Sequence, residues 1–404
     1  MTFVAVVRAA LFFLFVLGAL VGINTFVYRR ARAAFDLSRR ARQILIAVLA
    51  TTLLAVILGR TIGRWTGDEL ARAVGGAGMI VQLGVIVAFA MLGVERLGVL
   101  LWRAASKLRF KQDEKAPVVD DPPQEEGLIG RRELLSRTVA GTALGVGASS
   151  ALYGAIWGRH DYVIEEVPVR LAKLPRTLDG FTLVQLSDIH LGTFVGEREI
   201  GYSADLVAQA KPDLIVLTGD HVDHDERYME MLGAMLRRLR DIAPIAAVPG
   251  NHDYYAGIHA MTDVMQRAGV ELLVNRSVKL GDRGGRIALC GVDDVWARRQ
   301  YGGRGPDLKR ALTDVPDDVA RILLCHNPEF FPEAAERVDL QLSGHTHGGQ
   351  FNPLVRPAEL FLPYIAGRYQ RGDAQLYVNR GFGTAGPPAR LGAAPEVTKI
   401  ILTT

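Results

Sequence analysis

The sequence of 404 residues is poor in cysteine and has no histidine before residue 160. Cys290 and Cys325 are its only cysteines, which is too few for a disulfide-rich scaffold, and both lie in apolar, strand-like runs. We therefore expect two free, buried thiols, with a single disulfide as the alternative. All nine histidines fall between His160 and His347, so imidazole-dependent chemistry is expected only in the C-terminal part of the chain.

The chain also lacks a strong net charge. Its 47 Lys and Arg residues nearly balance 43 Asp and Glu residues, which gives a formal net charge of +4. A dedicated nucleic-acid-binding protein usually has a strongly basic face, so this balance argues against that class. The length indicates two or three structural units rather than one average domain.

Three stretches of the N-terminal third have almost no polar side chains: residues 3–28, 44–59 and 73–94. Arg8 is the only charged residue of the first, and Gln82 is the only strongly polar residue of the third. About 20 apolar residues in a helix span the ~30 Å hydrocarbon layer of a membrane. Buried core helices are the alternative, but such helices rarely lack a polar face over this length. We predict a transmembrane region with three helices in residues 1–105.

Basic residues predict the orientation of these helices. The first connection, residues 29–42, has six arginines and one acid, whereas the second, residues 60–72, is mixed. Residues 103–115 are basic again, and the positive-inside rule places the first and third connections in the cytoplasm. Residues 106–132 continue into an acidic, proline-bearing stretch that cannot bury a core, and we predict a cytoplasmic linker there.

A pair of arginines, Arg131 and Arg132, precedes a moderately hydrophobic stretch rich in Gly, Ala and Ser. This arrangement resembles a twin-arginine export signal, and an ordinary fourth membrane helix is the alternative. Both interpretations give a signal or anchor helix at residues 133–158 and place the following residues outside the cytoplasmic membrane. We expect the helix to stay as an anchor, with cleavage as the alternative.

Residues 159–404 have the composition of a soluble α/β domain. Short apolar runs predict strands at residues 181–186, 213–217, 245–248, 286–291, 321–325, 338–342, 376–379 and 397–402. Amphipathic stretches predict helices at residues 198–210, 228–240 and 258–268.

Five of these predicted strands end in residues that commonly bind metals. They are Asp188, His190, Asp220, Asn251, His326, His345 and His347. Open α/β sheets bind ligands at the carboxyl ends of their strands. Carboxylates combined with imidazoles suit first-row divalent ions such as Mn, Fe or Zn. Seven ligands exceed the number that one tetrahedral zinc needs, so we predict two ions that share one carboxylate.

The order of these residues resembles the signature of the calcineurin-like metallophosphoesterase superfamily. The matching strings are Asp188-x-His190, Gly219-Asp220, Gly250-Asn251-His252-Asp253, His326 and Gly344-His345-x-His347. Residues 348–350 and 379–383 further resemble the bacterial membrane-associated branch typified by the YkuE and YaeI phosphodiesterases. The resemblance covers residues 165–404. It implies two packed mixed β-sheets flanked by helices, with a di-metal site at the strand C-terminal ends, preceded by an all-α transmembrane region.

The resemblance also implies how the ligands divide. One divalent ion would be held by Asp188, His190 and His347, and the other by Asn251, His326 and His345. Asp220 would bridge the two ions, and a metal-bridging hydroxide would attack the phosphorus atom.

Four further residues have expected roles near this site. His252 is the residue implied to protonate the leaving oxygen or to stabilise the transition-state charge. Asp253 is expected either to orient His252 or to lie exposed on a loop. Arg380 is expected either to contact a substrate phosphate or to be exposed or ion-paired. His221 stands where the family usually has an apolar residue, and we favour a solvent-facing loop histidine over a substrate contact.

These features predict a membrane-anchored di-metal phosphoesterase that hydrolyses phosphodiester or phosphomonoester bonds outside the cytoplasmic membrane, with a lipid or cell-envelope substrate. The alternatives are a nuclease or nucleotide phosphodiesterase of the same superfamily, a non-catalytic metal-binding sensor or scaffold, and a transporter. The modest charge argues against a nuclease, and the intact ligand set argues against a scaffold. The scarcity of polar groups in the membrane helices argues against a transporter. The expected partners are the lipid bilayer and a phosphoester, not nucleic acid, and the oligomeric state stays open.

Overall fold

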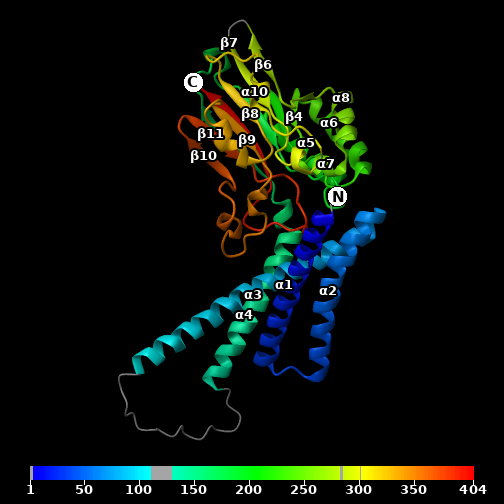
Figure 1. The fold of residues 1–404 in the computed structure, drawn as a ribbon, viewed down its shortest axis with the longest axis vertical. Helices are drawn as coiled ribbons and strands as arrows, with labels where there is room; N and C mark the ends of the chain where they lie inside the picture. Colours follow the sequence, from blue (N-terminus) through cyan, green and yellow to red (C-terminus); the bar gives the residue numbers. More distant parts are fainter. Residues whose placement is uncertain (1–2, 111–129, 283–284, 301) are drawn as a thin grey trace. The chain divides into compact units, whose positions relative to one another are not determined.

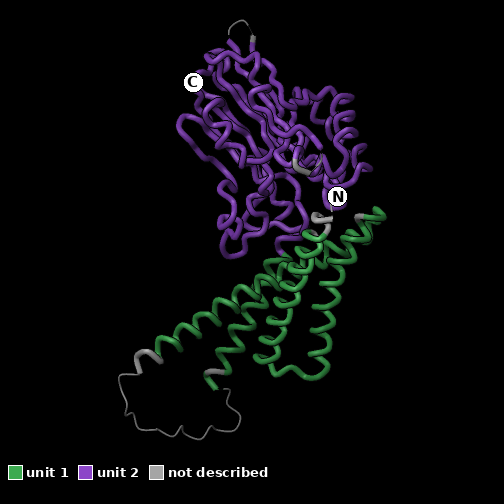
Figure 2. Tube along the Cα trace, in the orientation of Figure 1, with its two compact units in different colours: residues 1–152 green, residues 153–404 purple. Residues whose placement is uncertain are grey.

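The computed structural model describes residues 3–110, 130–282, 285–300 and 302–404 (Figure 1). The chain divides into two compact units, residues 1–152 and 153–404 (Figure 2). Most of the predicted linker, residues 111–129, lies outside the described residues. The predicted domain boundaries after residues 105, 132 and 158 stay predictions.

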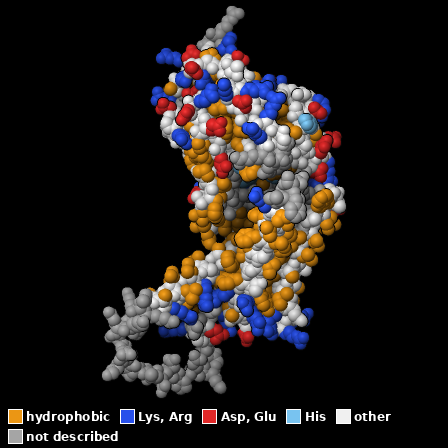
Figure 3. Space-filling view, in the orientation of Figure 1, with side chains coloured by type: hydrophobic (Ala, Val, Ile, Leu, Met, Phe, Trp, Pro, Cys, Tyr) orange, Lys and Arg blue, Asp and Glu red, His pale blue; other side chains and the backbone are white. Residues whose placement is uncertain are grey.

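Four long helices precede the β-sheets. They are α1 (Phe3–Phe35), α2 (Arg39–Thr66), α3 (Glu69–Phe110) and α4 (Arg131–Ile156). Each is long and apolar enough to cross a membrane, which confirms the prediction of a membrane region. Figure 3 shows hydrophobic side chains covering the long helices, with Lys and Arg side chains gathered at the end where α1 turns into α2.

The connections between the first three helices are shorter than predicted. Residues 29–42 were expected to form a loop, but most of them are helical and only residues 36–38 form the turn. Arginine is a good helix former, so helices continue through their basic flanks. The polar residue Gln82 of α3 is buried, and it accepts a hydrogen bond from Asn24 (2.8 Å) and donates one to Thr52 (3.0 Å). These partners satisfy the polar groups and join three helices, as is common in membrane bundles.

The second unit contains two six-stranded mixed sheets, which confirms the predicted fold class. The first has the order β1 (Val163–Arg170), β12 (Glu396–Thr403), β2 (Thr182–Leu186), β3 (Leu214–Thr218), β4 (Ile245–Val248) and β5 (Glu271–Leu272). The second has the order β10 (Gly367–Arg371), β11 (Ala374–Val378), β9 (Leu340–Ser343), β8 (Arg321–Leu324), β7 (Gly285–Gly291) and β6 (Arg276–Asp282).

The strands that carry the site are parallel. In the first sheet β2, β3 and β4 run in one direction, and in the second sheet β7, β8, β9 and β11 do so. Because neighbouring parallel strands end at the same edge, each sheet brings several loops together there. The strands β12, β6 and β10 pair antiparallel with β2, β7 and β11, respectively.

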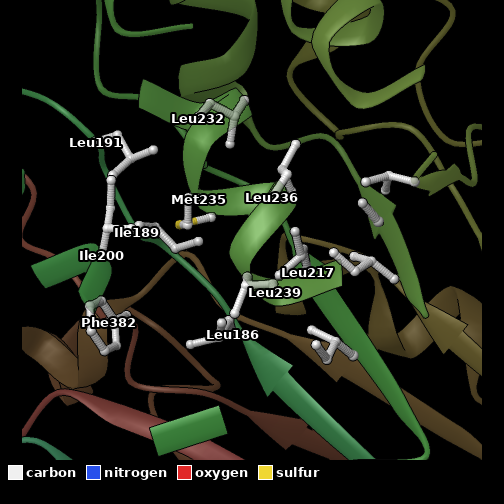
Figure 4. Close-up of a cluster of buried hydrophobic side chains, with 14 of the residues drawn as sticks. Leu186, Ile189, Leu191, Ile200, Leu217, Leu232, Met235, Leu236, Leu239 and Phe382 are labelled. Atoms are coloured by element: carbon white, nitrogen blue, oxygen red, sulfur yellow. The ribbon is translucent and has the colours of Figure 1, made fainter. Parts of the chain in front are cut away.

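The inner faces of the two sheets share one hydrophobic core. Val216 of β3 and Ala246 of β4 belong to the same buried cluster as Ile322 of β8 and Leu342 of β9. On the outer face of the first sheet, Leu186 and Leu217 pack in one cluster with residues of α6 (Met229–Arg240) and with Ile200 of α5 (Glu197–Ala210) (Figure 4). A strand that is buried on both faces has a continuous run of apolar residues in its sequence, which is why these strands were predicted.

All four strands that the sequence did not predict are sheet edges: β1, β5, β6 and β10. Edge strands commonly carry polar and charged side chains, which hide the apolar pattern. In β1, for example, Glu165 and Glu166 are exposed side by side. The three predicted helices are present as α5, α6 and α8 (Ile258–Arg267).

Candidate metal centre

The seven predicted metal ligands follow five strands that belong to both sheets. In the first sheet, Asp188 and His190 follow β2, Asp220 follows β3 and Asn251 follows β4. In the second sheet, His326 follows β8, and His345 and His347 follow β9. The site therefore forms where the ends of two facing sheets meet. The rule for open sheets considers the edge of one sheet, whereas here two sheets contribute strand ends.

Six of these side chains gather in two clusters that are joined by Asp220. In the first, Nε2 of His190 lies 3.1 Å from Nε2 of His347, which is 3.4 Å from Oδ1 of Asp188. In the second, Nδ1 of His345 lies 3.2 Å from Nε2 of His326. Oδ2 of Asp220 is 3.2 Å from Nε2 of His326 and 3.6 Å from Nε2 of His190, so it faces both clusters.

The donor atoms fit divalent metal ions. Two ligands about 2.1 Å from one ion, at angles of 90° to 109°, lie ~3.0 to 3.4 Å apart, and the imidazole pairs above have this spacing. Nδ1 of His326 lies 2.7 Å from the carbonyl oxygen of Thr218, which leaves Nε2 free to bind an ion. Oδ1 of Asn251 is buried and has no hydrogen-bond partner among the described residues. An orphaned buried acceptor of this kind is explained by an ion.

The Calcineurin-like phosphoesterase family matches residues 181–349. The uncharacterized metallophosphoesterase YkuE of Bacillus subtilis is 31% identical over 287 residues, which cover 68% of this chain and 98% of that protein. The chain belongs to the calcineurin-like metallophosphoesterases. An uncharacterized metallophosphoesterase of Aquifex aeolicus is 32% identical over 59% of this chain and 91% of its own length.

Some relatives of this metallophosphoesterase are named as transmembrane proteins. A "transmembrane protein with metallophosphoesterase domain" from Danio rerio is 34% identical over 64% of this chain. The match covers 62% of that protein, so the chain spans less than two thirds of it. The solved structure of Haemophilus influenzae NAD nucleotidase aligns with a TM-score of 0.36 and 15% identity, over 50% of this chain and 45% of that one.

The backbone at the ligands of this metallophosphoesterase is left-handed. Nine non-glycine residues of the described chain have positive φ, and five of them are predicted ligands: Asp188 (51°), His190 (51°), Asp220 (53°), His345 (74°) and His347 (52°). Such angles cost of order 1–3 kcal/mol each and concentrate at functional sites. His345 and His347 are only two positions apart in the sequence. The chain turns at both residues, and their rings enter different clusters.

Two glycines of the motif leave room for carboxylates. A Cβ atom on Gly250 would lie 2.2 Å from Oδ1 of Asp220, and one on Gly344 would lie 2.1 Å from Oδ2 of Asp188. Both distances are far inside van der Waals contact. The amide next to Gly344, the N–H of His345, donates to both carboxylate oxygens of Asp188 (3.0 and 2.9 Å). The glycines therefore let the backbone approach and fix the carboxylates.

The charges of the second cluster depend on Asp220. Burial raises the pKa of Asp220, but the neighbouring histidines, His326 above all, together hold this pKa well below its usual range. Burial lowers the pKa of His326, but Asp220 and other carboxylates hold it well above its usual range. Burial lowers the pKa of His345 to about 3 and that of His347 well below its usual range. Both of these rings are therefore neutral, as metal ligands must be.

The sequence analysis missed Asp223, which holds His252. Nδ1 of His252 lies 2.8 Å from the carbonyl oxygen of Asp223 and 3.2 Å from its carboxylate. The same carboxylate is 2.6 Å from His224 and 3.5 Å from His190. Burial lowers the pKa of His252, but the bond to Asp223 and the charges of Asp220 and Asp223 raise it to about 9. An aspartate three residues after Asp220 on the same loop was the signal available in the sequence.

Both expectations for Asp253 were wrong. Its carboxylate is fully buried and, among the described residues, forms its hydrogen bonds with groups other than the His252 side chain. It accepts hydrogen bonds from the amides of Gly250 (2.8 Å), Asp220 (3.1 Å) and His221 (2.9 Å), and from Nδ1 of His221 (2.9 Å). His221 is likewise fully buried rather than solvent-facing. The pair fixes the loop that carries Asp220, because it ties the ends of β3 and β4 together.

Two arginines lie on the side of Asp188 and His347. Arg380 forms ion pairs with Glu165 (2.9 Å) and Glu396, so the ion-paired alternative describes it in this structure. Arg390, which the sequence analysis missed, is fully buried with Nη2 3.0 Å from Nδ1 of His347. A guanidinium only donates, so this contact leaves the proton of neutral His347 on Nε2. An ion can bind Nε2 only after the proton has left it for Nδ1, and the contact between Arg390 and Nδ1 must then be released.

Proposed function

We propose that the chain is a membrane-anchored, metal-dependent phosphoesterase that hydrolyses phosphodiester or phosphomonoester bonds. The observation that carries this proposal is the pair of Asp/His clusters joined by Asp220. One ion would be held by Asp188, His190 and His347, and a second by Asn251, His326 and His345, with Asp220 between them. Mn, Fe or Zn suits this donor set. When bound, such ions lower the pKa of a coordinated water and neutralise phosphoryl oxygens.

His252 is the proposed proton donor. Its Nδ1 is engaged by Asp223, whereas its Nε2 has no hydrogen-bond partner among the described residues. With a pKa of about 9, the ring is a cation at neutral pH and carries a proton on Nε2. An alkoxide leaving group needs such a proton, and general acid catalysis contributes ~10²–10⁴-fold. The same cation also attracts the anionic phosphoryl group.

The membrane helices support a proposal for the location. The arginine-rich end of α1 and the start of α2 favour a cytoplasmic position, which puts the phosphoesterase domain on the extracytoplasmic side. Arg131 and Arg132 begin α4, so we propose that α4 is a twin-arginine-like signal that is retained as an anchor. A domain held at this surface meets lipid headgroups and other envelope phosphoesters.

The test is turnover by the full chain, purified in detergent and stripped of metal with a chelator. Mn, Fe or Zn is then added back to separate samples with bis-p-nitrophenyl phosphate, p-nitrophenyl phosphate or extracted phospholipids. We expect metal-dependent release of product from at least one ester. Metal binding without turnover of any ester contradicts the proposal and favours a sensor or scaffold. Oligonucleotides serve as a further substrate, and their faster hydrolysis than that of the other esters favours the nuclease alternative.

A further inference from the structure

Residues 351–363, between His347 and β10, form a loop with exposed hydrophobic side chains, which we name the apolar loop. Leu354, Val355, Leu360 and Phe361 are 58%, 69%, 80% and 82% exposed. In the described chain after residue 157, only two other large hydrophobic side chains are exposed, and these are 41% and 37% exposed. Four such residues within eight positions mark an interaction surface. In Figure 1 this loop is the orange segment between β9 and β10.

The apolar loop is held in an ordered conformation. The amides of Phe361 and Leu362 both donate to the carbonyl of Ala358 (3.0 and 2.9 Å), which makes a tight helical turn around the short helix η6 (Pro357–Leu360). This turn presents Leu360 and Phe361 next to each other at the surface. The turn thus holds these apolar side chains at the protein surface, where a partner can contact them.

Both ends of the apolar loop are tied to the metal centre. The side chain of Asn352 donates to the carbonyl of Gly348 (2.9 Å) at the start of the loop. At its end, the hydroxyl of Thr346 donates to the carbonyl of Ile365 (2.5 Å). Thr346 stands between the predicted ligands His345 and His347, so whatever binds the loop lies close to the site.

The start of the apolar loop also contacts the end of a membrane helix within the same compact unit. The amide of Arg390 donates to the carbonyl of Gly154 in α4 (3.0 Å), and the amide of Asn352 donates to that of Leu391 (2.7 Å). A Cβ atom on Gly154 would lie 3.0 Å from the ring of Phe351. The loop therefore begins where α4 ends.

Aromatic residues at the end of α4 indicate the level of the membrane surface. Tyr153 and Trp157 are 47% and 58% exposed, and their rings stack 6.1 Å apart. Tyr and Trp are enriched where membrane helices leave the hydrocarbon. The candidate membrane span Glu133–His160 includes most of α4 and ends just after it, so the start of the apolar loop lies near this interface.

We propose that the apolar loop inserts into the lipid interface of the same membrane that α4 crosses. Its side chains Leu354, Val355, Leu360 and Phe361 would enter the boundary between headgroups and acyl chains, as interfacial segments do to a depth of ~5–10 Å. The start of the loop lies beside Gly154 at the end of α4, a helix long and apolar enough to span a membrane, and this favours lipid over a soluble peptide or a second copy of the chain. If the proposed function holds, the inference narrows its substrate to a phosphoester in a lipid headgroup, delivered beside His345 and His347.

The first test places a fluorophore on the apolar loop. The full chain with Phe361→Cys is labelled with a polarity-sensitive NBD group and reconstituted in nanodiscs of phosphatidylethanolamine and phosphatidylglycerol. The native Cys290 and Cys325 are fully buried, so labelling is selective. The control is Lys279→Cys, an exposed position on β6. The apolar loop leads into β10, and β6 is the opposite edge of the same sheet, so a label there is on the other side of the sheet from the loop. We expect a blue shift and quenching by lipids with a doxyl group near the headgroup for Phe361→Cys but not for Lys279→Cys.

Equal quenching of the two labels overturns the inference. A blue shift at Phe361→Cys that appears only as the protein concentration rises in detergent also overturns it, because the loop then faces a second copy of the chain. This readout needs no turnover, so a catalytically inactive chain can still bear out membrane insertion. Failure of the proposed function is thereby distinguished from failure of this inference.

A second test links the apolar loop to the substrate. The double variant Leu360→Ser with Phe361→Ser removes apolar surface without touching a predicted ligand. We expect it to hydrolyse p-nitrophenyl esters at the wild-type rate but to lose most activity on phospholipid in vesicles. If wild type hydrolyses vesicle lipid and the double variant does so equally fast, the loop does not deliver lipid to the site.

Discussion

His252 and Asp223 form a double contact at the edge of the metal centre. Nδ1 of His252 is 2.8 Å from the carbonyl oxygen of Asp223 and 3.2 Å from its carboxylate Oδ1. The carbonyl fixes the ring through the backbone, and the carboxylate stabilises its positive charge. One residue thus controls both the orientation and the protonation of the proposed acid.

The variant Asp223→Asn should therefore move the pH profile. The pKa of His252 is raised to about 9, so the ring is protonated below that pH and loses its proton as pH rises through it. Removal of the Asp223 charge lowers this pKa, and the alkaline fall in kcat should begin at lower pH. The measurement is kcat against pH on an ester with an alkoxide leaving group. An unchanged alkaline limb would show that Asp223 does not set the charge of His252.

His252→Ala should separate proton donation from metal binding. The geometry alone allows His252 to join a cluster with His190 and Asp220, so its role needs this test. We expect near wild-type metal content and a fall in kcat of ~10²–10⁴-fold for an alkoxide leaving group. The fall should be smaller for bis-p-nitrophenyl phosphate, because nitrophenolate leaves without a proton. His345→Ala is the matched control and should lose metal and slow both esters alike. Loss of metal from His252→Ala as well would make His252 a ligand.

Asp220→Asn should keep the fold but lose most metal and nearly all activity. Oδ2 of Asp220 faces both clusters, and removal of its charge leaves two cations to repel each other at short range. The amide is isosteric, so it retains an oxygen to accept the hydrogen bond that the amide of His252 donates (2.8 Å). Metal content by elemental analysis and kcat test this directly. Two tightly bound ions per chain with normal turnover would rule out a bridging role.

A reporter enzyme fused after Thr404 should be active only outside the cytoplasm. Four helices are long and apolar enough to cross a membrane, and the arginines at the end of α1 and start of α2 favour a cytoplasmic side. An even number of crossings, with the first connection inside, leaves the C-terminus outside. Alkaline phosphatase and green fluorescent protein fusions report opposite sides. Fluorescence without phosphatase activity would overturn the outside location of the domain.

The sequence by itself determined the features whose signal is local and continuous. Strands such as β3 and β8 are buried on both faces, so each appears as an unbroken apolar run, and the membrane helices do so at greater length. The candidate ligand motifs follow these runs directly, so the sequence also indicated which strand ends to search for a site. The edge strands were not, because exposed residues such as Glu165 interrupt their pattern.

Only the tertiary structure decided which side chains meet. Arg390 reaches His347 across 43 positions, and Asp223 reaches His252 across 29, with no periodicity in the sequence to link them. The buried pair of His221 and Asp253 likewise depends on β3 and β4 lying side by side. The left-handed turns at His345 and His347 send neighbouring histidines into different clusters. Such contacts arise from chain reversal and sheet packing, so they exist only once the two sheets have come together.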